Sequence, residues 1–84
     1  MAKLKQTEGK LLRAGYVREH DGSSHQVWID ATPNQGCNIA FWVRGEEVDG
    51  SFKVVGREPD RPEFDHFTST YTSSVSQAIR LARI

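Results

Sequence analysis

The sequence predicts an α+β fold in which two helices cover one face of an antiparallel sheet. An apolar stripe at helical spacing lies near each end of the chain, segments with a two-residue period lie between them, and short polar turns separate those segments. Antiparallel strands joined by short turns need one covered face, and the helices carry the apolar stripes that suit it. We therefore expect one domain over residues 1–84. Its order is a helix, three or four strands and a helix, in a two-layer sandwich.

The first expected element is a helix over residues 2–14, with a strand over 11–17 as the alternative. Gly15 follows the helix as a natural C′ residue, because glycine enters the left-handed region without a Cβ penalty. Three leucines lie near one stripe of this helix: Leu4, Leu11 and Leu12.

Four segments in the middle of the chain are expected to be strands: 16–19, 26–31, 38–43 and 51–56. Asp21-Gly22 is the strongest turn signal between the first two, and the proline-containing segment 32–36 separates the second from the third. The second and third segments are expected to form a hairpin with Trp28 and Trp42 near each other on the uncovered face. Residues 45–50 are expected to form a polar, acidic turn.

The last segment is the clearest helix, because its apolar residues follow the i, i+3, i+4, i+7 pattern. Ser74 and Gln77 match the spacing of a capping box at its start. Arg80 and Arg83 lie in its final turn, where cations suit the helix dipole or contact phosphate. The apolar stripe consists of Val75, Ala78, Ile79 and Ala82.

Composition favours a small cytoplasmic protein. The 84 residues are 37% hydrophobic and carry 11 basic and 11 acidic side chains, a balance that differs from that of a uniformly basic nucleic-acid binder. No apolar run approaches the ~18 residues of a membrane helix, so we expect no membrane partner. The single cysteine, Cys37, forms no internal disulfide and fits a reducing compartment.

The charges are unevenly distributed along the chain. Residues 1–20 hold five basic and two acidic side chains, whereas residues 44–65 hold four basic and seven acidic ones. This pattern suggests one surface that attracts phosphate and another that repels it.

Residues 11–25 carry the most specific pattern in the chain. A segment reading Leu-Leu-Arg-Ala-Gly-Tyr-Val precedes the turn Gly22-Ser23-Ser24-His25. This arrangement resembles the HicA family of toxins from toxin–antitoxin pairs, over about residues 4–30 and more loosely from Ser73 to Ile84. The resemblance implies a fold like the double-stranded-RNA-binding domain, mRNA cleavage with His25 as the catalytic group, and a cognate antitoxin as partner.

The chemistry of these residue types agrees with that implication. Cleavage by attack of a ribose 2′-hydroxyl needs a group that takes the hydroxyl proton, and histidine, with a side-chain pKa of about 6.5, suits that role at neutral pH. Ser23 and Ser24 are expected to donate hydrogen bonds to a phosphate oxygen. The cations expected to neutralise phosphate are Lys10, Arg13 and Arg18.

The alternative function is non-enzymatic binding to a protein partner, as in a phage- or plasmid-type accessory protein. Segment 57–71 is expected to be a long loop, and exposed aromatics with a polar rim suit a small interface. A homodimer paired through an exposed sheet edge is a third interpretation. No spacing typical of a metal site or cofactor loop occurs. The expected protein-binding residues are Glu46, Glu47, Asp49, Phe64 and Phe67.

Overall fold

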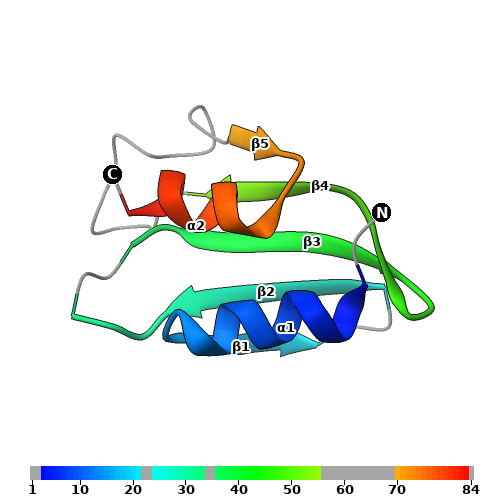
Figure 1. The fold of residues 1–84 in the computed structure, drawn as a ribbon, viewed down its shortest axis with the longest axis horizontal. Helices are drawn as coiled ribbons and strands as arrows, with labels where there is room; N and C mark the ends of the chain where they lie inside the picture. The colour runs from blue at the N-terminus through cyan, green and yellow to red at the C-terminus, as the bar shows by residue number, and fades with distance from the viewer. Residues whose placement is uncertain (1–2, 22–23, 34–35, 56–69, 84) are drawn as a thin grey trace.

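The computed structural model, which describes residues 3–21, 24–33, 36–55 and 70–83, confirms the α+β class. Two helices lie on the same face of a five-stranded antiparallel sheet whose strands are ordered as in the chain (Figure 1). Helix α1 lies over β1 and β2, and α2 lies over β3 and β4 (Figure 1). The elements are α1 (Leu4–Arg13), β1 (Tyr16–Asp21), β2 (His25–Asp30), β3 (Asn38–Arg44), β4 (Glu47–Val55), β5 (Thr70–Thr72) and α2 (Val75–Ala82).

The sheet contains one strand more than the four expected segments. Strand β5 pairs with β4, which places Tyr71 opposite Lys53 and Thr72 opposite Phe52. The sequence predicts a loop at Tyr71 because prolines and acids precede it. The other residues of that expected loop, up to residue 69, lie outside the described residues. The extra strand matters for function because it brings Tyr71 onto the open face of the sheet.

Local signals at the helix ends agree with the structure. Gly15 follows α1 with a φ of 93°, as a C′ glycine does, and the hydroxyl of Ser74 accepts a hydrogen bond from the backbone N–H of Gln77 at 3.1 Å. The predicted leucine stripe is wrong at one position. Leu11 is fully buried, whereas Leu12, about 100° further around the helix, is 60% exposed.

The two tryptophans lie on opposite faces of the sheet, which corrects the expected pairing. Trp28 is only 2% exposed, pairs with Ile39 of β3, and donates from Nε1 to Oε1 of Gln26 at 3.0 Å. Trp42 points away from the helices and is 58% exposed. Burying an indole removes more apolar surface than burying a valine, and Gln26 satisfies its N–H, so this register is favoured.

Asp30, at the end of β2, is a buried carboxylate that accepts five hydrogen bonds. Thr32 donates its backbone N–H at 2.9 Å and its hydroxyl at 2.6 Å, and the backbone N–H of Gly36 donates at 2.9 Å. Arg83 donates from Nε at 2.9 Å and from Nη2 at 3.2 Å. Its Nη2 also donates to the carbonyl of Ala14. One guanidinium therefore joins the C-terminal ends of both helices to the sheet.

Arg83 thus has a structural role, where the sequence predicts a dipole or phosphate contact. Its Cζ lies 5.1 Å from the ring centre of Tyr16, and burial raises the pKa of Tyr16 to about 12. The Tyr16 hydroxyl donates to the carbonyl of Cys37 at 3.3 Å. The N–H of Cys37 donates to the carbonyl of Ala82 at 2.8 Å. These contacts bury Cys37 and give it a structural position.

The free energy of unfolding is expected to fall at acidic pH because of Asp30. Burial alone would raise the pKa of this carboxyl, but the hydrogen bonds from Arg83, Thr32 and Gly36 outweigh it and hold the pKa well below its usual range. The unfolded chain therefore binds this proton more readily, and stability present above about pH 5 is lost as the pH falls below it. Urea unfolding between about pH 6 and pH 3 measures how steeply the free energy of unfolding falls with falling pH. Arg83→Gln should make this pH dependence less steep. An unchanged slope would contradict the role of Arg83 in lowering the pKa of Asp30.

Candidate functional site

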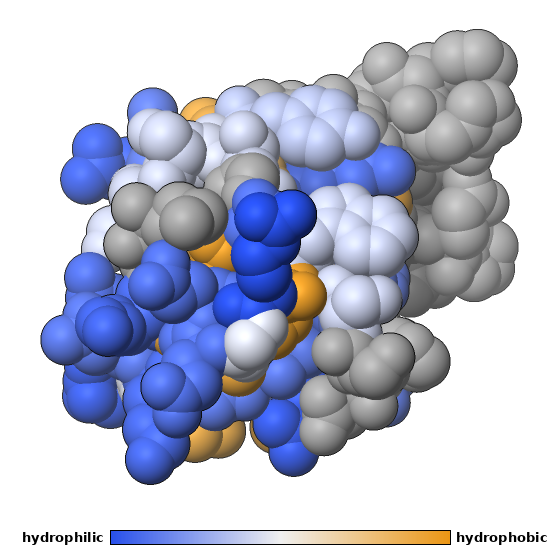
Figure 2. All heavy atoms as spheres, turned by 90° about the vertical axis from the view of Figure 1, so that its right-hand side faces the viewer, coloured by the Kyte–Doolittle hydropathy of each residue, from blue (hydrophilic) through white to orange (hydrophobic). Residues whose placement is uncertain are grey.

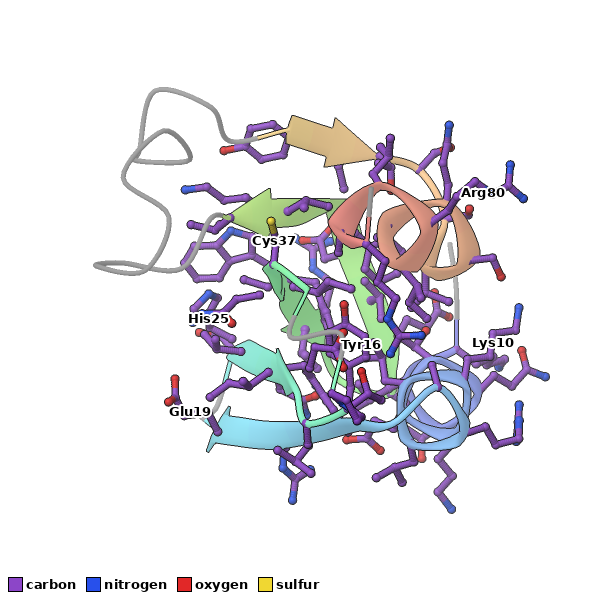
Figure 3. All side chains as sticks on the ribbon, turned by 90° about the vertical axis from the view of Figure 1, so that its left-hand side faces the viewer. Lys10, Tyr16, Glu19, His25, Cys37 and Arg80 are labelled. Carbon is purple, nitrogen blue, oxygen red and sulfur yellow. The ribbon has the colours of Figure 1, made fainter. Side chains whose placement is uncertain are left out.

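His25 is the first residue of β2 and lies on the face of the sheet opposite the helices (Figure 3). Its register partner on β3 is Trp42. The two rings have centroids 4.9 Å apart and planes tilted by 47°. The backbone N–H of Val43 donates to the carbonyl of Ser24 at 2.8 Å, which fixes the start of β2 against β3. The strand pairing therefore holds the imidazole, half-buried, against an exposed indole.

A hollow of about 220 Å³ opens beside His25 on the same face. Its floor includes Ala40, whose register partners are Val27 on β2 and Lys53 on β4. A methyl side chain between two larger neighbours leaves space above the sheet. The hollow is lined by His25, Ala40, Phe41, Trp42, Ser51, Lys53 and Tyr71.

Two large aromatic rings border this hollow without being buried. Trp42 is 58% exposed and Tyr71 is 63% exposed. Exposed large aromatics that gather in one place mark interaction sites more often than scattered single ones do. Figure 2 views the molecule from the end where β3 turns into β4. The helix side, on the left, is strongly hydrophilic, and the opposite side carries paler residues of intermediate hydropathy.

The structure does not bring together His25 and the cations predicted to serve it. Lys10 and Arg13 lie on α1, and Figure 3 shows Lys10 pointing outward on the helix side while His25 lies on the far side of the sheet. Arg18 forms an ion pair with Glu8 at 3.1 Å. The helix side is therefore a separate cationic surface.

Lys53 is the cation that the structure places in the hollow, and sequence reasoning missed it. Its neighbours Phe52 and Val54 are buried against the helices, so the two-residue period puts Lys53 on the open face. That signal exists in the sequence. The pairing of Lys53 with Tyr71 depends on β5 and has no local signal.

The structure describes only one of the two serines that were predicted to contact phosphate. Ser24 is exposed at the turn before His25, and its backbone carbonyl is used by Val43. Ser23 lies outside the described residues. Ser51, which lines the hollow from β4, is a further hydroxyl near the histidine.

The acidic residues proposed for protein binding gather toward the β3–β4 turn. That turn is only Gly45 and Glu46, shorter than the expected 45–50, because β4 begins at Glu47. The carbonyl of Glu46 accepts the N–H of Leu4 at 2.8 Å. Asp49 lies 3.7 Å from Arg44 in an ion pair. Phe64 and Phe67 lie outside the described residues.

A second hollow, of about 270 Å³, lies between the start of α1 and the β3–β4 turn. Its described lining residues carry charges of both signs and include no aromatic side chain. Its Glu8 already accepts hydrogen bonds from Arg18 and Gln26. We assign no chemistry to it. Its lining residues are Lys3, Leu4, Lys5, Glu8, Gly45 and Glu46.

Within the described residues, no group of three or more His, Cys, Asp and Glu side chains could hold a metal ion, and no described helix is long and apolar enough to cross a membrane. No family model, curated protein or solved structure matches this chain. The geometry around His25 and the sequence resemblance are the observations that bear on function.

Proposed function

We propose that this protein cleaves RNA in the cytoplasm, with His25 as the catalytic group. The observation that carries the proposal is the position of His25 in a solvent-open hollow that also contains the cation Lys53. A general base must lie where substrate reaches it, and a histidine packed in the core could not act.

The reaction follows from these two side chains. His25 takes the proton of a ribose 2′-hydroxyl, the 2′-oxygen bonds to the adjacent phosphorus, and the bond from phosphorus to the 5′-oxygen breaks. The 5′-oxygen leaves with a proton from water, so the products are a 2′,3′-cyclic phosphate and a 5′-hydroxyl. The ammonium of Lys53 stabilises the charge that develops on the phosphate oxygens.

The sequence resemblance to HicA toxins supports the same proposal. In this chain α1 ends at Arg13, Gly15 precedes β1, and His25 is the first residue of β2. A cognate antitoxin is then the expected protein partner. Because Lys10 and Arg13 lie on the helix side, Lys53 replaces them in the proposed role beside the scissile phosphate.

The test compares two lysines in a cleavage assay. Purified wild type is incubated with a single-stranded RNA, and the 2′,3′-cyclic phosphate end is detected by mass spectrometry. Lys53→Ala should lower the cleavage rate roughly 10- to 1,000-fold, the range for losing a charge that stabilises the transition state. Lys10→Ala, the matched control on the opposite layer, should change the rate less than about threefold, since exposed charges at that distance are screened. Equal effects of both substitutions, or no cyclic phosphate, would contradict the proposal.

Protein binding is the alternative function, and the exposure of Trp42 and Tyr71 is the observation that favours it. Aromatic side chains supply much of the energy of small interfaces. In that case Trp42→Ala abolishes capture of the partner while His25→Ala preserves it. Glu46, Glu47 and Asp49 would then form the polar rim.

A further inference from the structure

The open face presents its groups in an order that suits a nucleic-acid strand without a complement. Cross-strand pairing aligns Ala40, Lys53 and Tyr71 on three neighbouring strands, which lie about 4.8 Å apart. Trp42 follows Ala40 by two residues on the same face of β3, with His25 beside it. An indole, an ammonium and a phenol thus surround one small hollow.

The size of the hollow limits what it holds. Its volume of about 220 Å³ is below the roughly 300–1,000 Å³ of pockets that enclose a drug-sized ligand. It therefore suits one planar ring with a neighbouring polar group. A base that is paired and stacked in a duplex could not enter it, because its faces are already covered.

The local charge suits an anionic backbone beside that ring. Lys53 lies at the hollow, and Asp49 on the same strand is paired with Arg44. Glu46 and Glu47 lie at the far end of the hairpin, about 20 Å along β4 from Lys53 at 3.3 Å per residue. Asp49 is the register partner of Trp42, and Arg44 opposes its charge. Lys53 is the cation that lines the hollow in the described part of the chain.

We propose that the hollow takes one unpaired base of single-stranded RNA, with Trp42 and Tyr71 as stacking surfaces and Lys53 at the adjoining phosphate. This inference rests on the proposed RNA-cleaving function and names its substrate as single-stranded. The base faces an aromatic ring, as in other sheet surfaces that read single strands. The ribose next to that base then lies beside His25.

Binding is measured with an uncleavable probe, so that it is separated from cleavage. The probe is a 2′-O-methyl oligonucleotide of about ten nucleotides, labelled for fluorescence anisotropy, and its blunt duplex is the comparison. The single strand should quench tryptophan emission through Trp42 and bind more tightly than the duplex. Trp42→Phe should abolish the quenching and keep the anisotropy change, because phenylalanine still stacks.

A substitution that fills the hollow tests most directly whether the base binds there. Ala40→Leu places a larger side chain on its floor and should weaken binding of the single strand roughly 5- to 150-fold, the loss expected for one stacked base. Ala31→Leu, at an exposed position after β2, is the matched control and should not change affinity. Circular dichroism and the unfolding midpoint show whether both variants fold.

Salt dependence distinguishes the open face from the cationic helix side. One phosphate contact at Lys53 predicts a slope of log affinity against log salt of about −0.7. A duplex held by the five helix-side cations would give a slope of roughly −4.5. The five exposed cations on or next to the helices are Lys3, Lys5, Lys10, Arg13 and Arg80.

The outcomes separate this inference from the proposed function. Binding of the single strand that Ala40→Leu weakens supports the inference even where ordinary RNA is not cleaved, and then only the proposed function fails. Equal or tighter binding of the duplex with a steep salt slope overturns the inference, even where RNA is cleaved. Binding that Ala40→Leu does not affect, although the variant folds, also overturns it.

Discussion

Asp30→Ala is expected to lower the free energy of unfolding by about 3–5 kcal/mol, the cost of removing one partner from a buried ion pair. The side chain of Asp30 is completely buried, and that of Arg83 is 24% exposed. The substitution leaves the guanidinium without its carboxylate, and two backbone N–H groups, of Thr32 and Gly36, lose their acceptor. Each of these losses adds a desolvation cost.

That loss is large for a chain of this length. A protein of 84 residues has a total stability of roughly 4–13 kcal/mol, so the expected loss is between about a quarter of that stability and all of it. The ends of α1, α2 and β2 should separate first, because Arg83 joins them.

Chemical denaturation followed by circular dichroism measures this effect. Asp49→Ala is the matched control, because Asp49 belongs to an exposed ion pair with Arg44, and it should cost no more than about 1 kcal/mol. If Asp30→Ala and Asp49→Ala have the same unfolding midpoint, the buried cluster does not have the role assigned to it.

His25→Ala is expected to lower the rate of RNA cleavage by roughly 10²- to 10⁴-fold, the range for losing a general acid–base group. The side chain is half-buried on the open face and is not part of the core, so the variant should keep its fold and its unfolding midpoint. Binding of the uncleavable single strand should change far less, because Trp42, Tyr71 and Lys53 remain.

Cleavage is measured on protein purified identically for both forms, so that a contaminating nuclease would appear in both. His20→Ala is the matched control, since His20 lies on β1 one strand away from the hollow and pairs with Val27. If His20→Ala removes cleavage and His25→Ala does not, the catalytic role moves to His20. Equal activity in the wild type and both variants would reject His25 as the base.

Local sequence signals predicted much of the secondary structure. The stop at Gly15 and the cap formed by Ser74 with Gln77 depend on residues a few positions apart, and backbone sterics or one hydrogen bond decides each of them. The alternation from Ile39 to Val43 likewise follows from the period of a strand. Such features depend on neighbouring residues, so no distant part of the chain was needed to predict them.

The sequence did not determine which side chains of β2 point toward the helices and which point to the open face. In β2 both alternating sets contain apolar residues, and we expected Trp28 on the open face. Packing decided otherwise, because Trp28 fills the core and finds Gln26 for its N–H. Only Trp42 then remained beside His25.

The sequence by itself determined the α+β class, the approximate helix ends and a turn before the second strand, because these follow from local periodicity and turn chemistry. Only the tertiary structure decided the surroundings of that histidine. Lys53 and Tyr71 meet because β4 pairs with β5. Arg83 reaches Asp30 across 53 positions of sequence, and Lys10 lies on the opposite layer from His25. The physical reason is that strand register and burial depend on contacts between residues far apart in the chain. A short stretch of sequence does not include both partners of such contacts.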